Sequence, residues 1–235
     1  MTLQPDDIKV GEQSVRLLTN PTTFDREAPA ILAYAARTCT GTEYPGLFDE
    51  DPELQYQLLK RLLGSKHMSI FEHCSITVEL VTNRSLSHQL VRHRIAAYAQ
   101  KSMRYVKFTS ARGKDQLYVI RPYEYDSWTP KSQYLWRESI VSSVLCYDAL
   151  IEQGVKAEDA RGVLPQDIST KLIATWNLRQ LLHILYDSAC GRLRNKHAQP
   201  QIRELMGMLE TELKQRSKFL KFLLEMYTAY APEQQ

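Results

Sequence analysis

The 235-residue sequence lacks several features that would place a protein in a class at once. Its 9 glycines form no Gly-x-Gly-x-x-Gly pattern, so the common dinucleotide-binding loop is not indicated. Its 4 cysteines form no Cys-x-x-Cys pair, so neither a zinc ribbon nor a disulfide framework is indicated, and we expect no metal site. No run of 18 apolar residues occurs, and no basic segment leads into an apolar one at the N-terminus. We therefore expect a cytoplasmic protein that does not contact membranes.

The sequence also lacks a large excess of charge of either sign. The net charge is +3, with 43% hydrophobic and 24% charged residues, which is ordinary globular composition. Such a mild charge argues against a protein that coats nucleic acid, whereas a local basic cluster could still bind a small anion. The composition therefore favours a small anionic ligand over a polymer.

Apolar periodicity predicts both helices and strands. The predicted helices span residues 25–39, 52–63, 85–91, 130–153, 157–161, 177–186 and 201–230. The predicted strands span residues 14–18, 76–80, 105–108 and 117–120. Residues 172–176 fit either a buried strand or a helix fragment, and Asp25 is the expected cap of the first helix. Since no linker or repeat separates these elements, we predict one α+β domain over residues 1–235, a small mostly antiparallel sheet wrapped by long helices.

Residues 92–105 concentrate three arginines, a lysine, a histidine, a glutamine and a serine. The helical pattern ends just before them, so we expect a loop there. Because arginine binds phosphate through paired donors, Ser102 and Arg104 predict a phosphate site, and Arg92 and Arg94 could hold a second anion. The alternative is a solvated basic helix end that makes only surface salt bridges.

The order of these residues carries a resemblance. Arg-His-Arg at 92–94, followed after seven residues by Ser102 and then by Arg104 and Tyr105, resembles the signature of the flavin-dependent thymidylate synthases. Residues 67–73 resemble the family's His-x-Ser/Thr-x-Phe-Glu-His segment. Gln89 and the segments 160–165 and 177–179 follow in the family's order, so the resemblance covers roughly residues 25–205.

The sequence also departs from the family pattern. Ala97, Ala99 and Gln100 stand where many members have Ser, Asn and Glu. The family's arginine that rests near the pyrimidine N3 has no direct counterpart, because an ungapped count ends on Ser188. Several residues are inserted here relative to the family pattern. Arg192 and Arg194 are therefore the two candidates for this catalytic guanidinium.

The resemblance implies the flavin-dependent thymidylate synthase fold and the conversion of dUMP to dTMP. It implies methylenetetrahydrofolate as the carbon donor, FAD reduced by NADPH, and a homotetramer whose sites are shared between subunits. Since the transferred methylene must be reduced to methyl, a hydride source is obligatory. No cysteine lies in a recognisable nucleophile setting, which agrees with hydride supply by the flavin.

The resemblance also assigns site residues. At FAD it places Ser69, Glu72, Arg92, His93, Arg94, Gln100, Asn177, Arg179 and His183. At dUMP it places Gln89, Arg92, Gln100, Ser102, Met103, Arg104 and Arg161. His67 would line the entrance used by folate or nicotinamide. Taken singly, His183 could be a core histidine, Glu72 a strand-end carboxylate and Asn177 a helix cap.

Two other functions stay open at this point. One is C5-methylation or hydroxymethylation of another uridylate such as UMP, since Gln100 and the displaced arginine alter the family's pattern. The other is a module that binds single-stranded nucleic acid through the basic segment and nearby tyrosines. Those tyrosines are Tyr98, Tyr105, Tyr118, Tyr123 and Tyr125. The mild net charge counts against this module.

Overall fold

A computed structural model describes residues 9–42, 46–105 and 118–230. The N-terminal elements are β1 (Lys9–Gly11), β2 (Ser14–Leu17), α1 (Pro21–Thr40), α2 (Pro52–Gly64), the 3-10 helix η2 (Met68–Glu72), β3 (Ser75–Asn83), α3 (Arg84–Leu90) and β4 (Ala97–Gln100). The remaining elements are β5 (Tyr118–Ile120), η3 (Tyr125–Ser127), α4 (Pro130–Glu152), α5 (Ala157–Ala160), η4 (Arg161–Val163), β6 (Ser169–Asn177), α6 (Leu178–Tyr186), α7 (Pro200–Arg216) and α8 (Lys218–Tyr230). The predicted α+β class is therefore confirmed.

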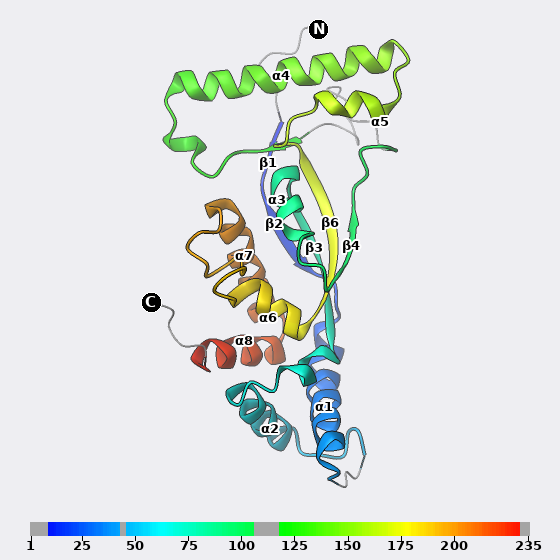
Figure 1. The fold of residues 1–235 in the computed structure, drawn as a ribbon, viewed down its shortest axis with the longest axis vertical. Coiled ribbons are helices and arrows are strands. Elements are labelled where there is room, and N and C mark those ends of the chain that lie inside the picture. Colours follow the sequence, from blue (N-terminus) through cyan, green and yellow to red (C-terminus); the bar gives the residue numbers. More distant parts are fainter. Residues whose placement is uncertain (1–8, 43–45, 106–117, 231–235) are drawn as a thin grey trace. The chain divides into compact units, whose positions relative to one another are not determined.

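The strands of the described chain form a four-stranded sheet in the order β2-β3-β6-β4 (Figure 1). β1 and β5 form a separate parallel pair. β2 and β3 are antiparallel, because Arg16 contacts Glu79 whereas Gln13 contacts Thr82. Tyr98 of β4 likewise bonds to β6 near its end, whereas Lys101 bonds near its start. The larger sheet is thus antiparallel, as the sequence predicted.

The chain divides into two compact units. The first unit contains the described residues within 1–14, 80–92 and 99–172, and the second those within 15–79, 93–98 and 173–235. Strands β3 and β6 contribute residues to both units, and the chain enters the second unit for the short stretch 93–98. The basic segment therefore supplies residues to each unit in turn.

The core of the first unit lies under α4. This helix buries Ile140, Val144 and Tyr147 against Val119 and other apolar residues. Met103 belongs to the same buried cluster, with 9% of its surface exposed. Since burying a methionine side chain stabilises by roughly 1.5–3 kcal/mol, Met103 anchors the polar residues on either side of it.

The core of the second unit is built largely from helices. α6 has an apolar face that includes Leu181 and Leu185, and α8 buries Phe219 and Leu223. Cys74, at the start of β3, is buried beside α1, and its backbone carbonyl accepts a hydrogen bond from Leu178 N at the start of α6. These contacts fix where α6 begins.

Two helix predictions are wrong in detail. The first helix begins earlier and is capped by Asn20, whose side chain accepts from Thr23 N, and not by Asp25. The predicted helix over 201–230 breaks into α7 and α8, because Ser217 adopts an extended backbone. Asp25 caps α8 instead: it accepts from Ser217 Oγ and from Lys218 N.

Other differences concern strands. Residues 172–176, which fitted either element, lie in strand β6. Residues 97–100, expected in a loop, form the short strand β4. β5 confirms the strand predicted at 117–120 from Tyr118 onward, whereas residues 106–117, including most of the strand predicted at 105–108, lie outside the described residues. Among the described helices, none has the length and apolarity needed to cross a bilayer.

Candidate functional site

α3, which leads into the basic segment, is anchored at its first turn. Asn83 caps it by accepting from Leu86 N at 2.8 Å. The same asparagine donates to Asp167 Oδ1 at 3.4 Å, and Trp136 of α4 donates to Asp167 Oδ2 at 2.8 Å. Burial raises the pKa of Asp167, which the bond from Trp136 partly offsets. The helix is therefore held to the core of the first unit by a polar bridge.

The side-chain amide of Gln100 donates two hydrogen bonds, which a glutamate carboxylate could not donate. Its Nε2 donates to Ser87 Oγ at 2.8 Å and to Thr170 Oγ1 at 3.2 Å, and both hydroxyl residues are buried. Because its nitrogen is directed at these hydroxyls, its carbonyl oxygen is the group that can accept from a ligand. The departure from the family's glutamate is thus accommodated by two hydroxyl neighbours.

Two predicted substrate residues, Arg104 and Arg161, meet at Glu158. Arg104 donates from Nε and Nη2 to Glu158 Oε2 at 3.2 and 3.1 Å, and its backbone N–H donates to Ser102 Oγ at 3.1 Å. Arg161 Nε donates to the Glu158 carbonyl at 3.0 Å. The Arg104 side chain is 53% exposed, so this ion pair faces solvent and is exchangeable. We call Ser102, Arg104, Glu158 and Arg161 the anion cluster.

Arg84 is a residue that the sequence reasoning missed. Burial, and after it the charge of Arg161, lower the pKa of Arg84, so the two guanidinium groups lie near one another. A third cation therefore stands close to the anion cluster. Its position at the first residue of α3, a few residues before Gln89, is the only signal that could have marked it.

His93 is the buried centre of a second cluster, in the second unit. It is 6% exposed, and its Nε2 accepts from Arg192 Nε at 3.1 Å. Burial, followed by the charges of Arg192 and His183, lowers the pKa of His93 to about 4. His93 is therefore neutral at physiological pH and carries its proton on Nδ1. We call His93 and Arg192 the imidazole pair.

The start of α6 brings further predicted residues together. Asn177 caps the helix by accepting from Gln180 N at 2.8 Å, as one of its two interpretations predicted. Arg179, two residues on, forms an ion pair with Glu72 of η2. The Glu72 side chain is 46% exposed, so it is a solvent-facing carboxylate just before β3, as one of its two interpretations predicted, and it is paired with a cation.

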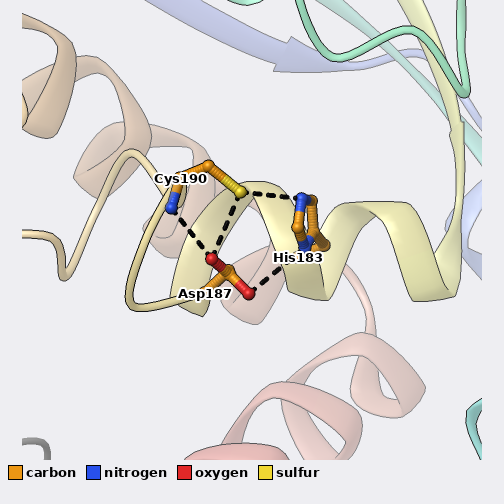
Figure 2. A group of neighbouring side chains, drawn as sticks. All are labelled: His183, Asp187 and Cys190. Atoms are coloured by element: carbon orange, nitrogen blue, oxygen red, sulfur yellow. Dashed lines mark hydrogen bonds and ion pairs between the residues drawn. The ribbon is translucent and has the colours of Figure 1, made fainter.

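The end of α6 carries a third group of side chains, His183, Asp187 and Cys190 (Figure 2). Burial would raise the pKa of Asp187, but hydrogen bonds from Cys190 and Ala189 outweigh it and lower that pKa. Burial and Asp187 raise the pKa of Cys190. His183 keeps 40% of its side chain exposed, so the interpretation as a core histidine is wrong.

The two candidate arginines have different surroundings. Arg192 is half-buried and bonds to His93 of the signature. Arg194 is exposed and lies over the ring of Tyr186, 5.1 Å from its centroid, with Glu210 nearby. In the described part of the chain, Arg192 therefore contacts the signature segment and Arg194 contacts Tyr186 instead.

His67 lines a cavity of about 380 Å³ between α1 and α2. Arg37, Arg61 and Ser65 lie in the same wall, and Leu58 contributes apolar surface. Ser69 lies nearby in sequence and is exposed. The cavity falls within the 300–1,000 Å³ range of small-molecule sites.

Comparison with known proteins gives a consistent result. The family model of the thymidylate synthase complementing protein matches residues 22–217. A flavin-dependent thymidylate synthase of Thermococcus onnurineus is 38% identical over 168 residues, which cover 71% of this chain and 64% of that protein. The same-named protein of Geobacter sulfurreducens is 37% identical over 181 residues, covering 75% of this chain and 73% of its own.

A solved structure is also similar. It is the UMP/dUMP methylase PolB from Streptomyces cacaoi, bound with 5-Br dUMP. The TM-score is 0.70 at 25% sequence identity, with 94% of this chain and 97% of that chain covered. The fold is therefore shared over nearly the whole length of both chains.

Proposed function

This chain belongs to the thymidylate synthase complementing protein family, and from that premise we propose that it methylates dUMP to dTMP in a flavin-dependent reaction. The observation that carries the proposal is the path of the signature segment. In its first part His93 bonds to Arg192, and in its second part Arg104 bonds to Ser102 and to Glu158, which also accepts from Arg161. Both parts consist of groups suited to a nucleotide and a cofactor.

The anion cluster is the proposed phosphate site of dUMP. Arg104 and Arg161 supply guanidinium donors, Ser102 supplies a hydroxyl, and Arg84 adds positive charge. Phosphate binds such forks in paired geometry. Glu158 holds Arg104 through an exposed ion pair, so a phosphate can take its place at modest cost.

The residues of the second unit fit FAD by their chemistry. Arg179, oriented by Glu72, and Arg94 offer cations for a pyrophosphate, and His93 offers a neutral ring. Both ring nitrogens of His183 face Asp187 and Cys190, so its exposed ring face is what it offers a flavin. When bound, FAD supplies the hydride that reduces the transferred methylene.

Arg192 is the proposed catalytic guanidinium. One of its N–H groups is used on His93, and four donors remain for the uracil ring. Because His93 is neutral, it orients the guanidinium without repelling it. A cation held in this way stabilises negative charge that develops on the pyrimidine as carbon is added.

The finer parts of the proposal come from the resemblance. They are NADPH as reductant, methylenetetrahydrofolate as carbon donor, a homotetramer with shared sites and a cytoplasmic location. The cavity lined by His67 supports the use of a folate or nicotinamide co-substrate. Its size and the arginines in its wall suit an anionic molecule that contains a ring.

One assay tests the proposal. The purified chain should be yellow and should oxidise NADPH when dUMP and methylenetetrahydrofolate are present, with dTMP as the product identified by mass. A colourless protein that binds oligonucleotides and gives no dTMP would support the nucleic-acid module instead.

A second function, methylation of UMP, is favoured by the similarity to the UMP/dUMP methylase. Gln100 presents a neutral amide where the family commonly has a carboxylate. UMP should be assayed in parallel with dUMP, and product mass separates methyl from hydroxymethyl transfer. If UMP gives no C5-modified product under conditions where dUMP does, this second function is excluded.

A further inference from the structure

The group at the end of α6 combines three kinds of metal ligand. His183 offers an imidazole nitrogen, Cys190 a sulfur and Asp187 a carboxylate oxygen, and these atoms lie within 4.8 Å of one another. Figure 2 shows the three side chains converging, with His183 on the last turn of the helix and Cys190 on the following turn. Imidazole, thiolate and carboxylate are the ligands that zinc takes in proteins.

The spacing of the ligand atoms suits one small cation. Cys190 Sγ lies 3.1 Å from His183 Nε2 and 3.2 Å from Asp187 Oδ1. Tetrahedral sites with bonds of about 2.0–2.3 Å hold their ligand atoms roughly 3.3–3.7 Å apart. A metal ion would therefore need the sulfur to move away from each of these two atoms by only a few tenths of an ångström. The ligand atoms of His183 and Asp187, which lie no more than 4.8 Å apart, complete the set.

The histidine already presents Nε2 to the sulfur. Its Nδ1 faces Asp187 Oδ2 at 3.5 Å, which directs Nε2 toward the sulfur. Asp187 is itself held by backbone N–H groups of Ala189 and Cys190, each 2.9 Å from Oδ1.

The charges balance as well. A thiolate and a carboxylate neutralise a dication, so the nearby Arg192 meets no excess positive charge. The carbonyl end of α6 also favours a cation.

We propose that His183, Asp187 and Cys190 bind one transition-metal dication of the Zn²⁺ type. Binding exchanges the thiol proton, which leaves to solvent, for a metal–sulfur bond. Three protein ligands leave a fourth position open, and Cys190 is exposed, so that position is accessible to water or a small ligand. The site extends the chain's chemistry beyond the proposed methylation and does not depend on it.

Cobalt binding to the full, reduced chain tests the site. Co²⁺ should bind at one equivalent and give a thiolate-to-cobalt charge-transfer band together with tetrahedral d–d absorption. Equilibrium dialysis should find one Zn²⁺ that competes with it. Cys190→Ser should abolish the charge-transfer band. Asp187→Asn, which can still accept the backbone N–H groups, should weaken binding roughly tenfold or more, since outer-shell changes alone reach that size.

Cys146→Ser and Cys39→Ser are matched controls, because both cysteines are exposed and lie outside the group. Both should keep the band and the stoichiometry of the unchanged chain. Equal metal binding by the unchanged chain and Cys190→Ser, or no thiolate band at all, would overturn the proposal. Circular dichroism confirms that each variant is folded. These readouts need no dTMP formation, so failure of the metal site and failure of the proposed function are told apart.

Discussion

The anion cluster of the first unit and the imidazole pair of the second unit hold their charges differently. In the anion cluster, Arg104 is 53% exposed and its partner Glu158 is 38% exposed. In the imidazole pair, His93 is 6% exposed and uncharged, and a single guanidinium stands beside it. The anion cluster thus contains an ion pair that faces solvent, whereas the imidazole pair places one positive charge against a buried neutral ring.

The anion cluster can therefore exchange one bound partner for another, whereas the side chains of the imidazole pair are already oriented before a ligand binds. A surface ion pair contributes about 0–1 kcal/mol, so Glu158 can be replaced by a phosphate with little loss. A buried imidazole fixed by a hydrogen bond keeps its orientation whether or not a ligand is present.

Arg192→Gln should reduce kcat by roughly 10²–10³-fold, or about 2.7–4 kcal/mol, because it removes a cation held at the developing charge. Arg194→Gln should change kcat by no more than a few-fold, since Arg194 lies over Tyr186. Steady-state dTMP formation measures both. If Arg194→Gln has the larger effect, the assignment of the catalytic guanidinium is reversed.

His93→Gln should make stability less dependent on pH. The folded pKa of His93, about 4, lies below its ordinary value of 6.5, so the unfolded chain binds more protons between these values. Stability therefore falls as pH falls from about 6.5 to about 4, by roughly 3 kcal/mol at most for this group. Glutamine can still accept from Arg192 but does not titrate.

Urea unfolding at several pH values measures this effect. The unchanged chain should lose more stability than His93→Gln across the window from pH 6.5 to pH 4. If the stability of the two proteins depends on pH in the same way, His93 titrates normally and the imidazole pair is not oriented before a ligand binds.

Arg104→Ala should raise the Kd for dUMP roughly 10- to 100-fold, because a charge-assisted hydrogen bond contributes about 1.5–3 kcal/mol. Bound flavin should stay nearly unchanged. Isothermal titration and flavin absorbance measure the two quantities. Arg121→Ala is a control, since it also removes an exposed guanidinium of the first unit, one that pairs with Asp126. Unchanged dUMP affinity in Arg104→Ala would contradict the phosphate site.

Glu158→Gln should tighten dUMP binding by at most several-fold, because it removes an exposed competitor worth about 0–1 kcal/mol. Asp159→Asn, the neighbouring exposed acid in α5, should have less effect. The same titration compares them. Weaker dUMP binding in Glu158→Gln would mean that Glu158 positions Arg104 and does not compete with phosphate.

Much of the fold followed from local pattern. The start of α2 at Pro52, the span of α4 and the strand at β3 depend on residues close in sequence, and they appear close to where they were predicted. The break between α7 and α8 did not follow. It depends on Asp25, which lies 192 residues from Ser217, and local periodicity does not report such a contact.

The family signature, the α+β class and the candidate residues for two ligands can all be read from the amino-acid sequence. Which of these residues contact one another depends on the folded chain. It placed Arg192 and not Arg194 at His93, and brought Arg104 to Glu158, because these pairs are joined by contacts across 99 and 54 residues of chain. Partners so distant in sequence are chosen by packing of whole elements, which no local pattern encodes.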